Sequence, residues 1–128
     1  MTKYNHILLI EDSDIDRYIA VHLLEKHFIS KQITVVKSGQ EALDWIRLAI
    51  YNNQPLPERI LLDLRLPDMG GIELIEILEQ YPPEILLLLN IVVVSSIIEK
   101  KEIDQIKNNK LVSLFIPKPL TFHSLNNI

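Results

Sequence analysis

Short apolar runs recur along the chain, separated by segments in which apolar residues follow a helical spacing. Each run is four or five residues long and is bounded by polar, glycine or proline residues. This is the pattern of a strand buried inside a sheet. It predicts five strands, at His6–Ile10, Ile33–Val36, Ile60–Asp63, Ile91–Ser95 and Val112–Ile116.

The segments between these runs predict helices. Two begin at a serine with an acidic residue three positions later, Ser13 with Asp16 and Ser38 with Glu41, which is the spacing of a capping box. Apolar residues at helical spacing follow each serine: Ile15, Tyr18, Ile19 and Leu23 in the first helix, and Ala42, Leu43, Ile46 and Ala49 in the second. Further helices are predicted over Gly71–Tyr81, Glu99–Asn108 and, in a short form, Thr121–Ile128.

One segment has two interpretations. Pro82-Pro83 ends the third helix, and "EILLLL" follows before the fourth strand begins. These residues fit either an extra helical turn or an early start of the strand, and the sequence does not decide between the two.

Strands and helices alternate five times, which predicts a doubly wound α/β fold with a five-stranded parallel sheet and helices on both faces. A chain of 128 residues suits one such domain, residues 1–128. In sheets of this kind ligands bind beyond the carboxyl ends of the strands. The residues at those ends are therefore the candidates for chemistry.

Polar residues stand at four of the five strand ends. Glu11 and Asp12 follow the first strand, Asp63 ends the third, Ser95 ends the fourth, and Lys118 follows the fifth. Three carboxylates brought together raise one another's pKa values unless a cation lies between them. Magnesium prefers such oxygen ligands. The strand ends therefore predict a Mg²⁺ site with a hydroxyl and a lysine beside it.

Composition narrows the class of protein. The formal net charge is −4 and no basic run is present, which argues against direct nucleic-acid binding. There is no cysteine, so thiol catalysis and disulfides are excluded. The most apolar stretch, residues 85–98, is shorter than the ~18–20 residues of a membrane-spanning helix and is read as core. No signal peptide opens the sequence, and we expect a cytoplasmic protein.

Four motifs in order, "LLIED", "LLDLRLPDMGG", "VVVSS" and "FIPKPL", cover residues 6–120. Together they resemble the receiver (CheY-like) domain of two-component response regulators. The resemblance implies the strand order 2-1-3-4-5. It also implies that Asp63 is the phosphoacceptor and that Glu11, Asp12, Asp63 and the backbone carbonyl of Arg65 bind Mg²⁺. Ser95 and Lys118 would contact the phosphoryl group, with a cis peptide bond before Pro119.

The resemblance also implies a mode of action. A histidine kinase or a phosphotransfer protein would donate the phosphoryl group, and the domain would catalyse its own phosphorylation and dephosphorylation without turning over a substrate. Ser95 and Phe115 would then move and alter the surface over residues 99–128. That surface would bind a downstream protein, an output domain that is not present here, or a second copy in a homodimer. Ile97 would shield the acyl phosphate from water.

Three other functions would use a related fold or a similar aspartate. A degenerate receiver would bind partners without phosphorylation, although every residue of the acceptor site is present. A haloacid-dehalogenase-type phosphatase needs a second aspartate two residues after the first, where this chain has Arg65. A flavodoxin-like redox module needs a glycine- and hydroxyl-rich loop where this chain has "EDSDID".

Several polar residues have simpler interpretations. Asp14, Asp16 and Asp68 are predicted to be helix caps or turn residues, and Trp45 to be a packing residue. The four histidines lack metal-ligand spacing and are treated as structural or surface residues.

Overall fold

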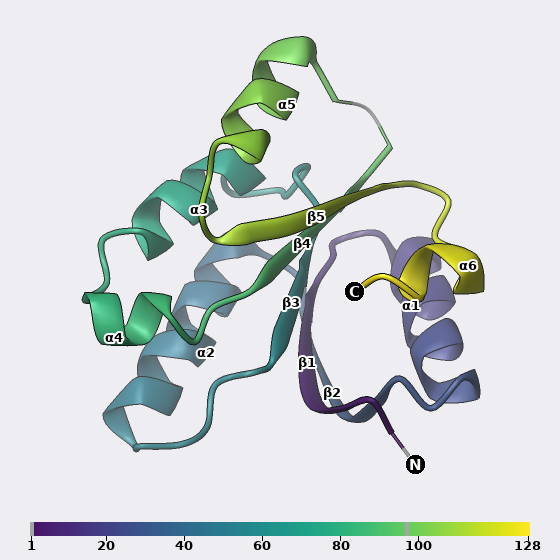
Figure 1. Ribbon diagram of the computed structural model, residues 1–128, viewed down its shortest axis with the longest axis horizontal. Coiled ribbons are helices and arrows are strands. Elements are labelled where there is room, and N and C mark those ends of the chain that lie inside the picture. Colours follow the sequence, from purple (N-terminus) through teal and green to yellow (C-terminus); the bar gives the residue numbers. More distant parts are fainter. Residues whose placement is uncertain (1, 97) are drawn as a thin grey trace.

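A computed structural model describes residues 2–96 and 98–128 of the chain. Its centre is a five-stranded parallel sheet in the order β2-β1-β3-β4-β5 (Figure 1). The strands are β1 (Tyr4–Ile10), β2 (Ser30–Val36), β3 (Arg59–Leu62), β4 (Ile91–Ser95) and β5 (Val112–Pro117). The five predicted strands and their order are confirmed. The third ends at Leu62, so Asp63 lies just beyond it rather than within it.

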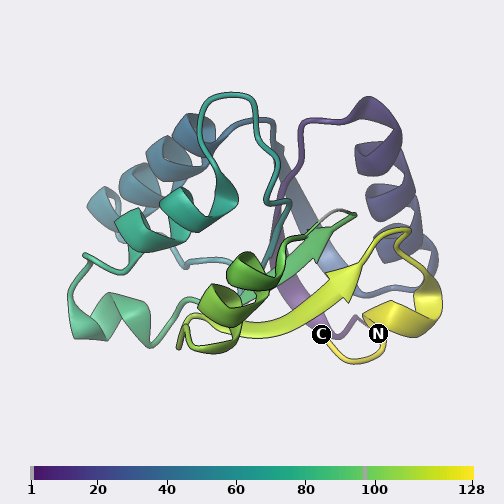
Figure 2. The same ribbon diagram turned by 90° about the horizontal axis from the view of Figure 1, so that it is seen from above.

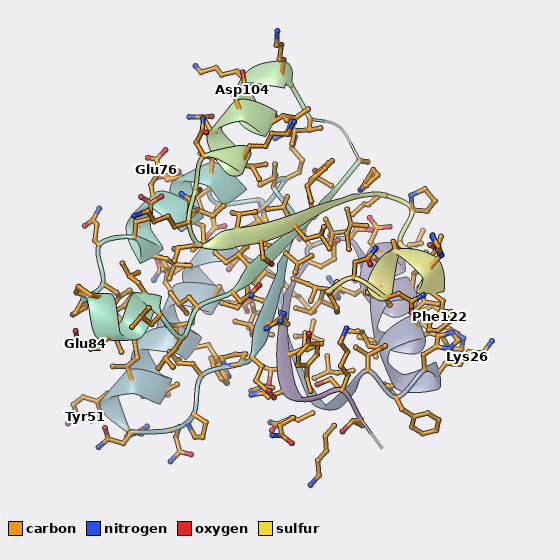
Figure 3. The ribbon with its side chains drawn as sticks, viewed as in Figure 1. Lys26, Tyr51, Glu76, Glu84, Asp104 and Phe122 are labelled. Atoms are coloured by element: carbon orange, nitrogen blue, oxygen red, sulfur yellow. The ribbon has the colours of Figure 1, made fainter. Side chains whose placement is uncertain are left out.

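Helices cover both faces of the sheet. They are α1 (Asp14–Lys26), α2 (Gly39–Tyr51), α3 (Gly71–Leu78), α4 (Pro83–Leu86), α5 (Lys100–Lys107) and α6 (Phe122–Leu125). α1 and α6 lie on one face, and α2, α3, α4 and α5 lie on the other (Figure 1). Charged residues on the second group, including Glu76, Glu84 and Asp104, point away from the sheet (Figure 3).

The segment that the sequence left open forms a helical turn. α4 begins at Pro83, where a proline is favoured because the first N–H groups of a helix have no partner inside it. Leu87 and Leu88 follow it and are exposed. Three predicted helices are shorter than expected: α3 ends at Leu78 rather than Tyr81, α5 loses one residue at each end of the predicted 99–108, and α6 has four residues within the predicted 121–128.

Alternate residues of each central strand enter two separate cores. Leu8 and Ile10 of β1 pack toward α2 and α3, in a cluster that includes Ile46 and Leu74. Ile7 and Leu9 pack in the second cluster with Leu24 of α1. This division follows from the two-residue repeat of a strand. Burial on both faces explains why the central strands read as continuous apolar runs.

Candidate active site

The site residues are held in register by backbone hydrogen bonds that continue beyond the strands. The N–H of Glu11 donates to the carbonyl oxygen of Val36 at 3.0 Å, and that of Asp63 to Ile10 at 3.1 Å. The N–H of Lys118 donates to the carbonyl oxygen of Ser95 at 3.1 Å. The strands end at one edge of the sheet, to which the arrowheads of β4 and β5 point (Figure 2). Their polar residues therefore meet there.

Lys118 is the centre of the cluster. Its ammonium Nζ donates to Asp16 Oδ2 at 2.7 Å, to Glu11 Oε1 at 2.8 Å and to Asp63 Oδ2 at 3.0 Å. Burial by itself lowers the pKa of this amine, but the hydrogen bonds to the three carboxylates outweigh burial and raise the pKa. The lysine is therefore a fixed positive charge at the edge of the sheet. The peptide bond between Lys118 and Pro119 is cis, as the family resemblance implies.

Asp63 is buried, and its two carboxylate oxygens have different partners. Oδ1 accepts from the backbone N–H of Arg65 at 3.0 Å and from the fully buried Ser95 hydroxyl at 3.4 Å. Oδ2 accepts from Lys118. A buried carboxylate requires such partners, because an unpaired buried charge is strongly unfavourable. The predicted grouping of Asp63, Ser95 and Lys118 is present in the structure.

Glu11 is the second buried carboxylate, with 4 % of its surface exposed. Its Oε2 accepts from the N–H of Ser13 at 3.1 Å. Burial raises the pKa of Glu11, and the nearby charge of Asp63 raises it further, while the hydrogen bond from Lys118 lowers it. Glu11 and Asp63 thus repel each other across one shared ammonium, so this position attracts positive charge.

The acidic loop after β1 is supported by Arg17, which sequence reasoning missed. Its Nη1 donates to the carbonyl oxygen of Asp12 at 2.6 Å and to that of Glu11 at 3.2 Å, and its Nη2 pairs with Asp14. The guanidinium therefore fixes the main chain that presents the two acids. An arginine one helical turn after an acidic loop is a weak signal, since most such arginines are solvated.

The structure assigns Asp16 a different partner from the one predicted. Ser13 Oγ does accept from the N–H of Asp16, at 3.3 Å, so Ser13 caps α1 as expected. The carboxylate of Asp16 does not complete a capping box but binds Lys118. The interpretation of Asp16 as a cap residue was wrong, because only the tertiary structure brings the first turn of α1 beside the end of β5.

The predicted magnesium ligands are partly assembled. Glu11 and Asp63 face the same ammonium, whereas Asp12 is exposed. Among residues 2–96 and 98–128, no three His, Cys, Asp or Glu side chains are placed to hold an ion as they stand. The donors nevertheless fit Mg²⁺ in kind, because they are carboxylate oxygens gathered around one positive charge. The Mg²⁺ site, including the carbonyl of Arg65, stays a prediction.

Arg65 links the loop after Asp63 to the start of α5. Its two terminal nitrogens donate to the two carboxylate oxygens of Glu102, at 2.7 and 2.8 Å. Glu102 Oε1 also accepts from the N–H of Glu99, and so forms part of the capping box of α5. A two-point ion pair of this kind fixes orientation as well as distance. The loop after Asp63 and α5 are therefore directly coupled.

We expect the contribution of this pair to depend on pH. The hydrogen bond from Arg65 lowers the pKa of Glu102 from 4.5 to about 2. Because the folded-state value is the lower one, the stabilisation is present above pH 4.5 and is lost as the pH falls toward 2. Glu102→Gln is expected to reduce the free energy of unfolding by about 1 kcal/mol at neutral pH, as for a partly exposed ion pair.

The measurement is denaturant unfolding of the wild type and of Glu102→Gln at pH values from neutral toward 2. The difference between them should shrink on acidification. Glu76→Gln is the matched control, since Glu76 is exposed and points away from the sheet (Figure 3). If the loss of unfolding free energy in Glu102→Gln did not change with pH, or equalled that in Glu76→Gln, the stabilising role of the Arg65–Glu102 pair would be contradicted.

Asp68, on the loop after Asp63, also has tertiary partners. Asp68 was predicted as a cap or turn residue, and its carboxylate accepts from the N–H groups of Gly39 and Gln40 at 2.9 and 2.8 Å. It therefore caps α2, a helix distant in sequence.

Phe115, the predicted switch residue on β5, is half-buried against the core cluster that contains α2 and α3. Ile97, for which a shielding role was predicted, lies outside the described residues.

Comparison with known proteins identifies the family. The sequence model of the response regulator receiver domain matches residues 7–128. The chain belongs to this family. As a receiver domain it is 30 % identical over 119 residues to the probable methanogenesis regulatory protein FilR2 of Methanothrix harundinacea, spanning 93 % of this chain and 75 % of that protein.

In two other relatives the matched residues cover only part of the protein. Response regulator Rcp1 of Synechocystis is 34 % identical over 77 residues, which cover 59 % of this chain and 52 % of Rcp1. The aerobic respiration control sensor protein ArcB of Escherichia coli is 31 % identical over 80 residues, or 62 % of this chain and 9 % of ArcB. The segments that match in sequence thus cover about half of Rcp1 and a small part of ArcB.

Solved structures agree with the family assignment. A two-component response regulator from Cytophaga hutchinsonii superimposes with a TM-score of 0.88 at 25 % identity, over 98 % of this chain and 93 % of that one. The Mn²⁺-bound form of Rcp1 gives a TM-score of 0.77 at 25 % identity, over 96 % and 87 % of the two chains. Within the described part of this receiver domain, no helix is long and apolar enough to cross a membrane.

Proposed function

We propose that this receiver domain accepts a phosphoryl group on Asp63 and signals through the change that follows. One observation carries the proposal: a buried aspartate has one oxygen on a lysine ammonium and the other on a serine hydroxyl and a backbone N–H. A phosphoryl group carries several oxygens with negative charge, and these donors can stabilise that charge.

The proposed reaction proceeds by attack of an Asp63 carboxylate oxygen on phosphorus. The new P–O bond forms as the bond from phosphorus to the donor histidine nitrogen breaks, and the donor ring, protonated on its other nitrogen, leaves as a neutral imidazole. Lys118 stabilises charge on the transferred group, and Ser95 donates a hydrogen bond to one of its oxygens. Water later attacks the acyl phosphate, which releases inorganic phosphate and restores Asp63.

A divalent cation, which we propose to be Mg²⁺, would be held by Glu11, Asp12, Asp63 and the carbonyl of Arg65. When bound it neutralises charge that develops on the phosphoryl oxygens. The Mn²⁺-bound form of Rcp1 supports the binding of a divalent cation. The present chain contributes the buried oxygens and the electrostatic attraction of Glu11 and Asp63 for a cation.

The proposed partners follow from the family and its relatives. Receiver domains interact with histidine kinases or phosphotransfer proteins and with output domains. The match to the sensor protein ArcB and to a phosphorylated response regulator, RcpA, supports a place in a phosphotransfer chain. We place the domain in the cytoplasm. The output is an attached domain, a separate downstream protein or a second copy of the receiver.

The proposed switch involves Ser95, Phe115 and the surface of α5, β5 and α6. Ser95 would move toward the phosphoryl group, and Phe115 would turn into the space it leaves. The Arg65–Glu102 ion pair supports a route from Asp63 to α5, because it joins the loop after Asp63 to the first turn of that helix. The shortness of α6 leaves α5 and β5 as most of this surface.

The test is incubation with acetyl phosphate followed by intact-mass spectrometry. We expect the mass of one phosphoryl group to be added in the presence of Mg²⁺, and not after chelation. Asp63→Asn should show no gain, because an amide is a much weaker nucleophile than a carboxylate. Asp68→Asn is the matched control, since Asp68 is a helix-capping acid on the same loop, and it should be phosphorylated like the wild type.

A folded protein that shows no mass gain, and no response of its spectrum or stability to beryllofluoride, would contradict the proposal. It would favour the degenerate receiver, which acts as an interaction module without phosphorylation. A gain that survives Asp63→Asn would place the phosphoryl group on another residue and would contradict the assignment of Asp63.

A further inference from the structure

Lys118 has a third carboxylate partner that the four family motifs do not account for. Asp16 comes from the first turn of α1, whereas Glu11 and Asp63 follow strands. Its Oδ2 lies 2.7 Å from Nζ, the shortest of the three contacts. An ammonium has three N–H donors, and each of them here has one carboxylate acceptor.

The three partners differ in what else the proposed reaction requires of them. The oxygen of Asp63 that Lys118 contacts belongs to the carboxylate that would be phosphorylated. Glu11 is expected to bind the divalent cation. Asp16 takes part in neither event, so its bond to Lys118 is the one that can persist while the other two change.

If no partner persisted while Asp63 and Glu11 change theirs, the Lys118 side chain would be free to adopt many conformations. Four rotatable carbon–carbon bonds separate the ammonium from the backbone, and their ordering costs entropy. The neighbouring acid Asp14 is not such a partner, because it pairs with Arg17 and its side chain is 90 % exposed. Asp16, with 36 % of its side chain exposed, covers the ammonium from the α1 side.

We propose that Asp16 is a positioning residue that holds the Lys118 ammonium at the phosphoacceptor throughout the phosphorylation cycle. The inference rests on the proposed function of Asp63. Asp16 touches neither the phosphoryl group nor the cation, and acts only through Lys118. Its removal should therefore slow phosphorylation by leaving Lys118 with more conformations, and should have no effect where Lys118 is absent.

The experiment compares Asp16→Ala with Asp14→Ala, each alone and combined with Lys118→Met. The two acids stand in the same helical turn, so both changes remove one charge and the same favourable interaction with the helix dipole. At saturating Mg²⁺, Asp16→Ala is expected to lower the initial rate of phosphorylation by acetyl phosphate about fivefold, the effect of a partly exposed charged pair. Asp14→Ala should stay near the wild-type rate.

A second measurement does not depend on phosphorylation or on bound metal. Thermal unfolding of the same variants in metal-free buffer gives the coupling between Asp16 and Lys118 by a double-mutant cycle. We expect Asp16→Ala to lower the unfolding midpoint clearly more in the wild-type background than in Lys118→Met, because only the wild type loses the ion pair. An equal shift in both backgrounds would overturn the inference, because Asp16 would then act independently of the lysine.

The rate measurement separates the two proposals. If the wild type is phosphorylated but Asp16→Ala reacts as fast as Asp14→Ala, the positioning role is overturned while the proposed function stands. A loss of rate from Asp16→Ala that persists in Lys118→Met would also overturn it. If the wild type is not phosphorylated at all, the proposed function fails, and with it the positioning role that rests on it.

Discussion

Lys118→Met is expected to lower the free energy of unfolding by about 3 kcal/mol in metal-free buffer, the usual cost of breaking a buried ion pair by removing one partner. Methionine keeps an unbranched apolar stem in a side chain one atom shorter than that of lysine, and removes the charge. Glu11 and Asp63, both less than a tenth exposed, would then face each other without a counter-ion. Denaturant unfolding followed by the fluorescence of Trp45, the single tryptophan, would measure the loss.

Two controls make this prediction specific. Lys101→Met removes a charge from an exposed position on α5 and should change stability little. Excess Mg²⁺ should restore part of the stability of Lys118→Met, because the cation would replace the ammonium between the carboxylates. Equal losses in the two methionine variants would contradict the description of Lys118 as the counter-ion of this cluster.

Gly71→Ala is expected to destabilise the protein by about 2–3 kcal/mol, within the range for forcing a group into a packed site. A Cβ at Gly71 would lie 2.6 Å from Leu64 Cα and 3.2 Å from the carbonyl oxygen of Asp63. These are backbone atoms of the segment that carries Asp63, and they cannot yield as the end of a side chain can. The first residue of α3 must therefore move away from this segment, or the segment must move with Asp63.

The adjacent glycine provides the matched control. Gly70 is exposed, and a Cβ there would meet nothing within 4 Å. Gly70→Ala should change the unfolding free energy by less than about 1 kcal/mol, because the poorer N-cap preference of alanine is partly offset by the lower entropy of its unfolded chain. Gly71→Ala should also slow phosphorylation, while Gly70→Ala should not. Similar stabilities for the two variants would show that the close packing of α3 on Leu64 is not required.

The alternation of buried strands and amphipathic helices was enough to predict the fold. Ile60 to Leu62 could be recognised as a strand because a segment buried on both faces must be apolar throughout. Asp63 stood out for the same reason, as a charged residue directly after such a segment. The boundaries were harder to predict: "EILLLL" is compatible with either secondary structure, and in the structure Ile85 and Leu86 pack against the core from a helical turn at Pro83–Leu86.

The sequence by itself therefore determined the class of fold, and it predicted that Asp63, Ser95 and Lys118 meet at one edge of the sheet as the candidates for chemistry. It could do so because strand periodicity and strand ends are local properties of a chain. Only the tertiary structure decided which partners these residues have. Arg65 pairs with a residue 37 positions away and Asp16 with one 102 positions away. Such contacts depend on how helices lie over the sheet, and no local pattern of residues encodes that placement.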